Sequence, residues 1–89
     1  TNESPVHMAL LLYKAKALRE RGLSKAARDI VTETLRRKKG RPQELLHALN
    51  YERARAYEAL GQEKKARGEF EKLYKNASDY EDVAHRLGL

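Results

Sequence analysis

The chain has 89 residues, which is enough for one domain with a modest apolar core. It contains no cysteine, which excludes a disulfide framework and thiolate chemistry, and no apolar run approaches the roughly 20 residues of a membrane span. The net charge of +6 lies entirely in residues 1–44, because residues 45–89 hold equal numbers of cations and anions. A surface of this sign attracts acidic peptides, RNA or anionic membranes.

The first pair of helices is predicted between residues 5 and 39. Ser4 suits the N-cap, and Pro5 suits the first helical turn because its missing N–H costs nothing there. Apolar residues then recur at helical spacing until Gly22, which is expected to end the helix. Ser24 is expected to cap a second helix, which runs into the basic segment 36–40.

The second pair is predicted between residues 42 and 77. Pro42 opens a third helix, Gly61 stops it, and a fourth helix extends to a break at residues 76–78. Ser78 and Glu81 have the spacing of a capping box, so they predict a short last helix over about residues 79–87. Together with a composition dominated by Ala, Leu, Glu, Lys and Arg, this pattern indicates an all-α chain.

The two helix pairs are similar to each other in sequence. Shifting the chain by 39 positions aligns Gly22 with Gly61 and Ala27 with Ala66. Eight identities fall in the 32 positions from residue 6 to residue 37, where average composition would give about two or three. The same helix–turn–helix unit is therefore written twice.

The repeated unit resembles the tetratricopeptide repeat. The second unit carries the family's small, aromatic and glycine positions at Ala54, Tyr57, Gly61, Ala66, Phe70 and Leu73. Alanines at the crossing let the helices approach closely, and the aromatic residues fill the space beside that contact. The chain departs from the family in its period, which is 39 residues instead of the usual 34.

The resemblance implies one domain over residues 1–89, in which two antiparallel helix pairs form a right-handed stack. The first repeat spans about residues 5–39, the second spans about residues 42–77, and a short fifth helix at about 79–87 caps the stack. Each helix should chiefly contact its neighbours in the sequence.

The same resemblance implies a concave binding face built from the first helix of each pair. The inward positions include Ala9 and Ala48, and the residues expected to bind a partner are Leu12, Lys16, Arg19, Tyr51, Arg55 and Glu58. Each set climbs its helix at spacings of three or four and so forms one stripe. An apolar residue followed by a cation suits a peptide with hydrophobic and acidic side chains. A solvated charged face is the alternative interpretation.

The strongest local charge signal is the basic run between the two repeats. Its members are candidates for contact with an anion or with nucleic acid: Arg36, Arg37, Lys38, Lys39 and Arg41. The alternative is a helix C-terminus that favours cations and leads into an exposed loop. The absence of interleaved aromatic residues favours the latter.

No catalytic or metal-binding constellation is readable. Three serines occupy expected cap positions, and three histidines lie far apart without the spacing of a metal site: Ser4, Ser24, Ser78, His7, His47 and His85. The sequence therefore predicts a non-enzymatic protein, without cofactor or metal, that binds a protein or peptide. The alternatives are a basic domain that binds nucleic acid, and a structural or dimerisation domain.

Two further expectations concern partners and location. Two repeats are fewer than the three or so that such stacks usually need, so apolar surface around Val6, Leu10 and Leu12 is expected to be covered by a second copy or a neighbouring domain. The absence of cysteine and of a visible signal peptide predicts a cytoplasmic protein that does not enter a membrane.

Overall fold

The computed structural model describes residues 4–37 and 40–89, and within these ranges the chain is helical without any β-strand. This confirms the all-α prediction. The described residues form five helices, α1 (Pro5–Glu20), α2 (Ser24–Thr34), α3 (Gln43–Ala59), α4 (Glu63–Asn76) and α5 (Val83–Arg86).

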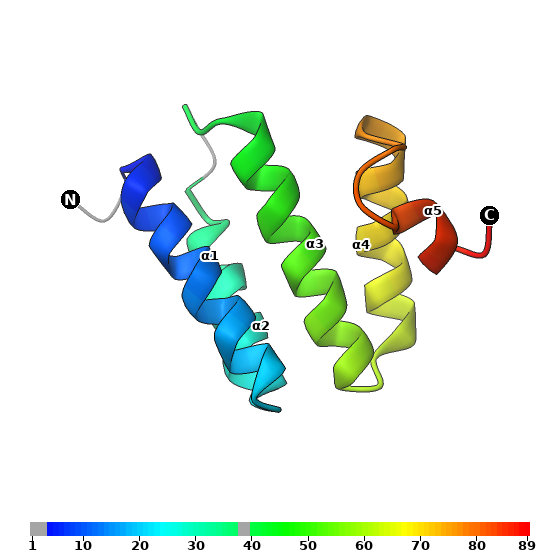
Figure 1. Ribbon diagram of the computed structural model, residues 1–89, viewed down its shortest axis with the longest axis horizontal. Coiled ribbons are helices and arrows are strands. Elements are labelled where there is room, and N and C mark those ends of the chain that lie inside the picture. Colours follow the sequence, from blue (N-terminus) through cyan, green and yellow to red (C-terminus); the bar gives the residue numbers. More distant parts are fainter. Residues whose placement is uncertain (1–3, 38–39) are drawn as a thin grey trace.

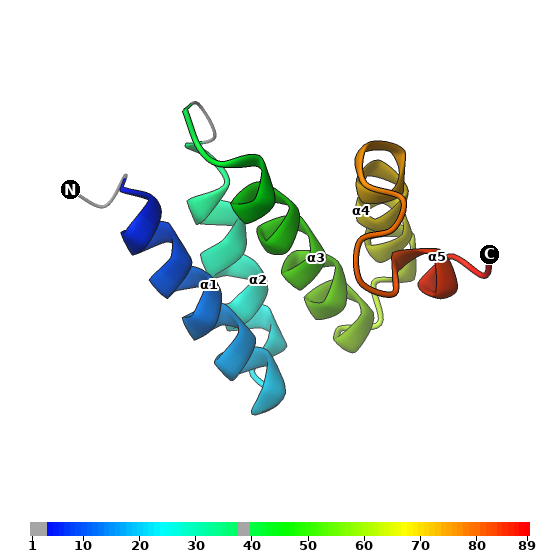
Figure 2. The same cartoon turned by 45° about the horizontal axis from the view of Figure 1, so that its top comes forward.

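The helices form two layers. In Figure 1, α1 and α3 run side by side, α2 lies behind α1, and the short α5 lies in front of α4. The turned view of Figure 2 shows α2 lying between α1 and α3. Each helix contacts its neighbours in the sequence, α1 also contacts α3, and α1 and α4 do not touch within the described ranges. This is the contact pattern expected of a stack, while its right-handed sense stays a prediction.

Both interhelical turns within the pairs have the same geometry. Gly22 and Gly61 have φ values of +87° and +75°. This backbone conformation is unfavourable for residues that carry a side chain. The amide that follows each glycine donates to a carbonyl five residues back, at 2.8 Å for Leu23 and 2.9 Å for Gln62. Equivalent residues of the two turns are 39 positions apart, so the repeated sequence is matched by a repeated backbone conformation.

The helix starts were predicted less well than the helix ends. Ser4 Oγ does accept the amide of His7 at 3.1 Å, as predicted. Ser24, however, is the buried first residue of α2, and Leu23 occupies the N-cap without a side-chain bond. The capping box at Ser78 is also wrong, because α5 begins only at Val83 and has no side-chain cap. The last helix therefore spans four residues instead of about nine.

The core consists of two adjoining apolar clusters. The first joins α1, α2 and α3, and its buried members are Met8, Ala15, Ala27, Val31, Leu35, Leu49 and Ala56. The second joins α3, α4 and α5, and its buried members are Ala54, Ala66, Phe70, Leu73, Val83 and Leu87. Ala54, Ala66 and Phe70, which carry the repeat pattern, are buried in this cluster. Tyr57 lies at its margin and is half-buried under the ammonium group of Lys65.

Arg53 ties three helices together. Its guanidinium makes two hydrogen bonds of 3.1 Å to the buried carboxylate of Glu69 on α4. A third hydrogen bond, of 3.2 Å, reaches the hydroxyl of Thr32 on α2. This fork binds a carboxylate in two places, which is the strongest geometry available to an ion pair. The fork therefore holds α3 and α4 of the second repeat together, and the hydrogen bond to Thr32 links that repeat to the first.

Packing does not require a glycine at position 68, inside α4. A Cβ built on this residue would meet nothing within 4 Å, and the residue is exposed. Gly68→Ala is therefore expected to raise the free energy of unfolding by about 1 kcal/mol, since alanine is the better helix former. Urea unfolding measures this gain. A loss of stability would contradict the open surroundings, and Gly61→Ala, at positive φ, should be destabilising in the same assay.

Candidate functional site

A groove lies across α1, α3 and the segment 77–82. It encloses a cavity of about 280 Å³ lined by Leu12, Tyr13, Lys16, Arg19, Ala48, Tyr51, Glu52, Arg55, Tyr80 and Glu81. Five of the six residues predicted to bind a partner line this one groove, and Glu58 does not. The helical register of α1 and α3 thus brings the two predicted stripes together.

The segment 77–82 forms a third wall that the sequence did not predict. The ring of Tyr80 lies 5.7 Å from that of Tyr51 and 6.0 Å from that of His47. The hydroxyl of Tyr51 donates a hydrogen bond to the carboxylate of Asp82, 31 residues further along the chain. Burial raises the pKa of the Tyr80 hydroxyl, and the carboxylate of Glu81 adds to the rise. No local sequence pattern marks these contacts, because they depend on how the chain returns after α4.

Tyr51 also connects the groove with the core. The ring of Tyr51 also contacts Phe70. The two ring centroids are 6.0 Å apart in an edge-to-face arrangement. Phe70 is only 2% exposed. Tyr51 in the floor of the groove therefore packs against the second apolar cluster.

Two of the three predicted cations are already engaged within the chain. The guanidinium of Arg19 forks onto the carboxylate of Glu52, and these side chains are only 13% and 6% exposed. Arg55 lies 3.3 Å from the carboxylate of Glu58 and 5.9 Å from the ring centroid of Tyr51. The sequence missed Glu52, because a carboxylate in a charged helix normally indicates a solvated face.

Lys16 is the groove cation that remains unengaged. Its side chain is exposed and makes neither an ion pair nor a hydrogen bond with any residue of the described ranges. A partner's carboxylate could bind it without displacing an existing contact. Lys16 is therefore the residue on which a charge-based test should be placed.

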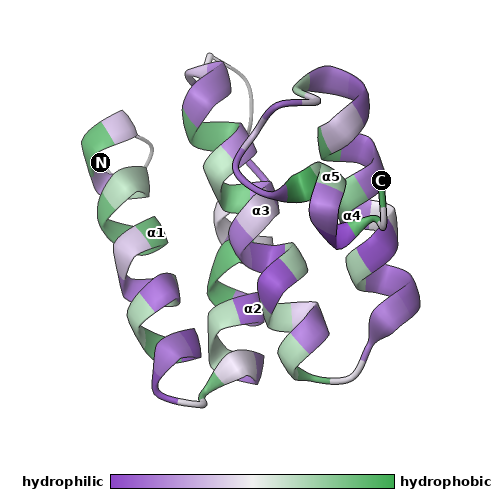
Figure 3. Ribbon diagram, turned by 45° about the vertical axis from the view of Figure 1, so that its right-hand side comes forward, coloured by the Kyte–Doolittle hydropathy of each residue, from purple (hydrophilic) through white to green (hydrophobic). Residues whose placement is uncertain are grey.

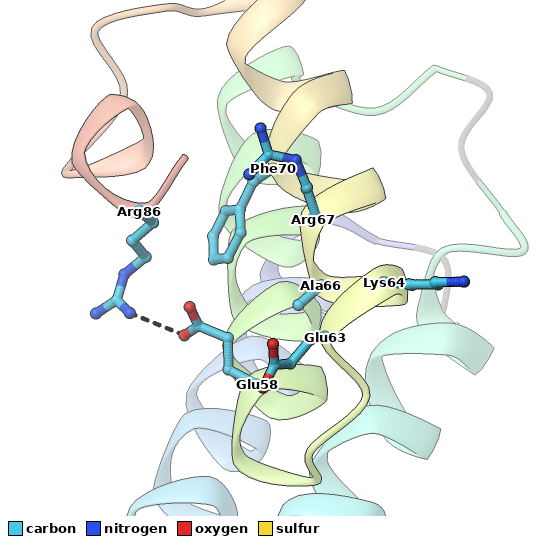
Figure 4. Close-up of a pocket in the computed structure, with 7 residues that line it drawn as sticks. All are labelled: Glu58, Glu63, Lys64, Ala66, Arg67, Phe70 and Arg86. Carbon is cyan, nitrogen blue, oxygen red and sulfur yellow. Dashed lines mark hydrogen bonds and ion pairs between the residues drawn. The ribbon is translucent and has the colours of Figure 1, made fainter. Parts of the chain in front are cut away.

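Glu58 does not line the groove itself, although its carboxylate lies 3.3 Å from Arg55, which does. Its carboxylate accepts a hydrogen bond of 2.8 Å from Arg86 and lines a second cavity of about 480 Å³, shown in Figure 4. The predicted role of Glu58 in binding a partner stays a prediction. Its observed role is to hold α5 against the end of α3.

The described residues of the basic run, Arg36, Arg37 and Arg41, do not line the groove. Arg36 is exposed and lies 3.3 Å from Glu33, and the side chain of Arg41 donates to the carbonyl of Arg37 at 3.3 Å. Arg37 and Arg41 line a separate small cavity near Met8, and Lys38 and Lys39 lie outside the described residues.

The contact between Asp82 and Tyr51 predicts a pH dependence. The pKa of Asp82 is lowered, chiefly by the hydrogen bond from Tyr51 and also by Arg86, whose Nε lies 3.0 Å from the carboxylate. A carboxyl whose pKa falls on folding stabilises the fold above its unfolded pKa of about 3.9, and this contribution is lost as the pH falls through the folded pKa.

Asp82→Asn is therefore expected to be less stable than the wild type at neutral pH, with a difference that vanishes in strong acid. Because the Asp82 side chain is 44% exposed, the difference is expected to be about 1 kcal/mol or less. Thermal unfolding of both proteins over a range of pH measures it. A difference that persists in strong acid would show that the contact is not electrostatic.

Comparison of the chain with models of protein families, with curated proteins and with solved structures finds no match. The tetratricopeptide resemblance therefore rests on the repeated residues alone. Within residues 4–37 and 40–89, no helix has the length and apolar character that crossing a bilayer requires.

Proposed function

We propose that the chain is a non-enzymatic protein-interaction module of tetratricopeptide type, which binds a peptide or a partner helix in the groove formed by α1, α3 and segment 77–82. The observation that carries this proposal is the gathering of Leu12, Lys16, Arg19, Tyr51 and Arg55 around one cavity of about 280 Å³. These residues come from two helices and are brought together only by the stacking of the repeats.

The chemistry of the groove favours an extended peptide with apolar and acidic side chains. Three tyrosines, Tyr13, Tyr51 and Tyr80, offer flat surfaces that lose little entropy on binding. Lys16 offers a charge without a competing carboxylate in the described ranges. Arg19 and Glu52 satisfy one another and serve to shape the groove. A bound peptide would therefore place an acidic side chain beside the ammonium group of Lys16 and an apolar side chain over the ring of Tyr51.

The experiment that tests this proposal combines selection with charge reversal. Peptides are selected from a displayed library on the wild-type protein, and their affinity is then measured for Lys16→Glu and for Lys25→Glu. Lys25 is an exposed cation on α2, away from the groove, and serves as the matched control. We expect Lys16→Glu to weaken binding about tenfold or more, which corresponds to about 1.4 kcal/mol. Both variants should melt like the wild type.

Wild-type affinity of Lys16→Glu for every selected peptide would overturn the groove as the binding site. Arg55→Glu is a poorer probe, because it would bring a second carboxylate beside Glu58 and remove the contact with Tyr51. Its effect on binding would be mixed with a loss of stability. The single change at Lys16 avoids this ambiguity.

A basic accessory domain that binds nucleic acid is the second candidate. It is favoured by the exposed Arg36, whose side chain is 70% exposed, and by the concentration of the net charge of +6 in residues 1–44. Such binding would be independent of sequence and would weaken steeply with salt. The groove itself offers fewer cations than this function needs, since Arg19 and Arg55 are paired with carboxylates.

A further inference from the structure

Helix α1 is apolar on two opposite faces. Met8 and Ala15 point into the first cluster and are almost completely buried. Val6, Leu10 and Tyr13 are 72%, 61% and 67% exposed. At 100° per residue, the three exposed side chains fall on one line along the face opposite to the buried residues. We call this line the outer stripe.

The outer stripe is more than scattered surface apolarity. Single exposed apolar residues are normal on any protein. Here three of the six large exposed apolar side chains in the described ranges lie on one line of one helix. Figure 3 shows apolar segments recurring along α1, whereas long hydrophilic segments dominate α4. A helix with apolar residues on both faces is normally buried on both.

The edges of the outer stripe carry unequal charge. Lys14 and Arg21 follow one edge, and Lys16 and Glu20 follow the edge toward the groove. All four are exposed, and none of their side chains pairs with a residue in the part of the chain that the structure describes. The groove edge is thus neutral in sum, and the outer edge carries two uncompensated positive charges.

We propose that the outer stripe binds an amphipathic helix of another protein, whose apolar stripe is flanked by acidic residues on the side facing Lys14 and Arg21. A helix fits because the spacing of Val6, Leu10 and Tyr13 is that of one seam in helix–helix packing. Acidic flanks fit because charges beside such a seam determine which partner is chosen.

A second copy of the chain fits this surface less well. It would present the same two edges, so Lys14 and Arg21 would face either the same two cations or the groove edge, where Lys16 offsets the charge of Glu20. The single carboxylate of Glu20 does not compensate for them. This argument is independent of the proposed groove function, although the two surfaces adjoin at Tyr13, which lines the groove.

The test uses two synthetic amphipathic peptides of about three heptads, with leucine at the seam positions and either glutamate or lysine at the flanking positions. Binding to the full chain is followed by fluorescence anisotropy of labelled peptide. We expect the glutamate peptide to bind about tenfold or more tightly than the lysine peptide, and this preference to weaken with salt. The double variant Lys14→Glu/Arg21→Glu should reverse the preference.

Two further variants separate the outer stripe from general stickiness. Leu10→Asp should abolish binding of the glutamate peptide, whereas Leu23→Asp, which alters a 54% exposed residue beyond the end of α1, should leave it unchanged. Equal affinity for both peptides, absence of binding, or insensitivity to Leu10→Asp would overturn the proposal. So would a dimer in sedimentation that Leu10→Asp dissociates, because a second copy would then cover the stripe. Binding of library-selected peptides that stays sensitive to Lys16→Glu in the Leu10→Asp background would leave the groove proposal intact.

Discussion

Replacing Arg19 by alanine is expected to lower the free energy of unfolding by about 3–5 kcal/mol, because it leaves a buried carboxylate without its partner. Glu52 is only 4% exposed, and Arg19 is the cation that forks onto it from α1. A domain of this size is stable by only about 5–15 kcal/mol, so the variant would lose a large share of its stability. Urea unfolding followed by circular dichroism measures the change.

The matched control removes both charges. The pair Arg19→Leu with Glu52→Leu should recover most of the stability, since well-packed apolar side chains replace a buried ion pair at little cost. The double-mutant cycle then reports the coupling between the two residues. A loss below about 1 kcal/mol for Arg19→Ala would mean that water reaches Glu52 and that the pair behaves like one on the surface.

The second large effect is expected for Phe70→Ala, at about 3–5 kcal/mol. Phe70 is 2% exposed and packs in the cluster that joins α3, α4 and α5. Its removal would leave a cavity and withdraw the edge-to-face support of Tyr51, so peptide binding in the groove should weaken as well. Calorimetry of the variant, together with its affinity for the selected peptides, tests both consequences.

Phe70→Leu is the natural comparison, because it keeps most of the apolar volume and should cost markedly less than Phe70→Ala. Tyr74→Ala, one turn further along α4, alters a residue that is 36% exposed and should change stability little. If the leucine and alanine variants of Phe70 were equally stable, the proposed cavity would not form.

The repeat and its turns could be predicted from the sequence because they depend on local conformation. Gly22 and Gly61 mark a backbone conformation that few other residues adopt, and their separation by 39 positions is visible without a structure. The resemblance to the tetratricopeptide repeat then implied that Leu12, Lys16, Tyr51 and Arg55 face inward, and helical spacing put each helix's residues in one stripe. The groove emerges from these faces once α1 and α3 lie side by side.

The remaining features depend on contacts between distant segments. Glu52 and Glu69 look in sequence like members of a solvated face, and only the approach of Arg19 and Arg53 across the helices explains their burial. The third wall of the groove depends on the return of the chain after α4, which carries Tyr80 and Asp82 back to Tyr51. No spacing rule contains this information.

The position of Arg53 bears on how the chain loses its structure. In a stack of helical pairs, each pair has its own stability and a further coupling to the next pair. Arg53 stands on α3 but holds Thr32 of the first repeat and Glu69 of the second through the same guanidinium. Separating the repeats would break the hydrogen bond to Thr32, whereas the ion pair with Glu69 would stay within the second repeat. Separation would also leave the buried carboxylate of Glu52 on α3 without Arg19 of α1, so a half-melted chain is unfavourable. We therefore expect the two repeats to melt as one cooperative unit, although each carries its own apolar cluster.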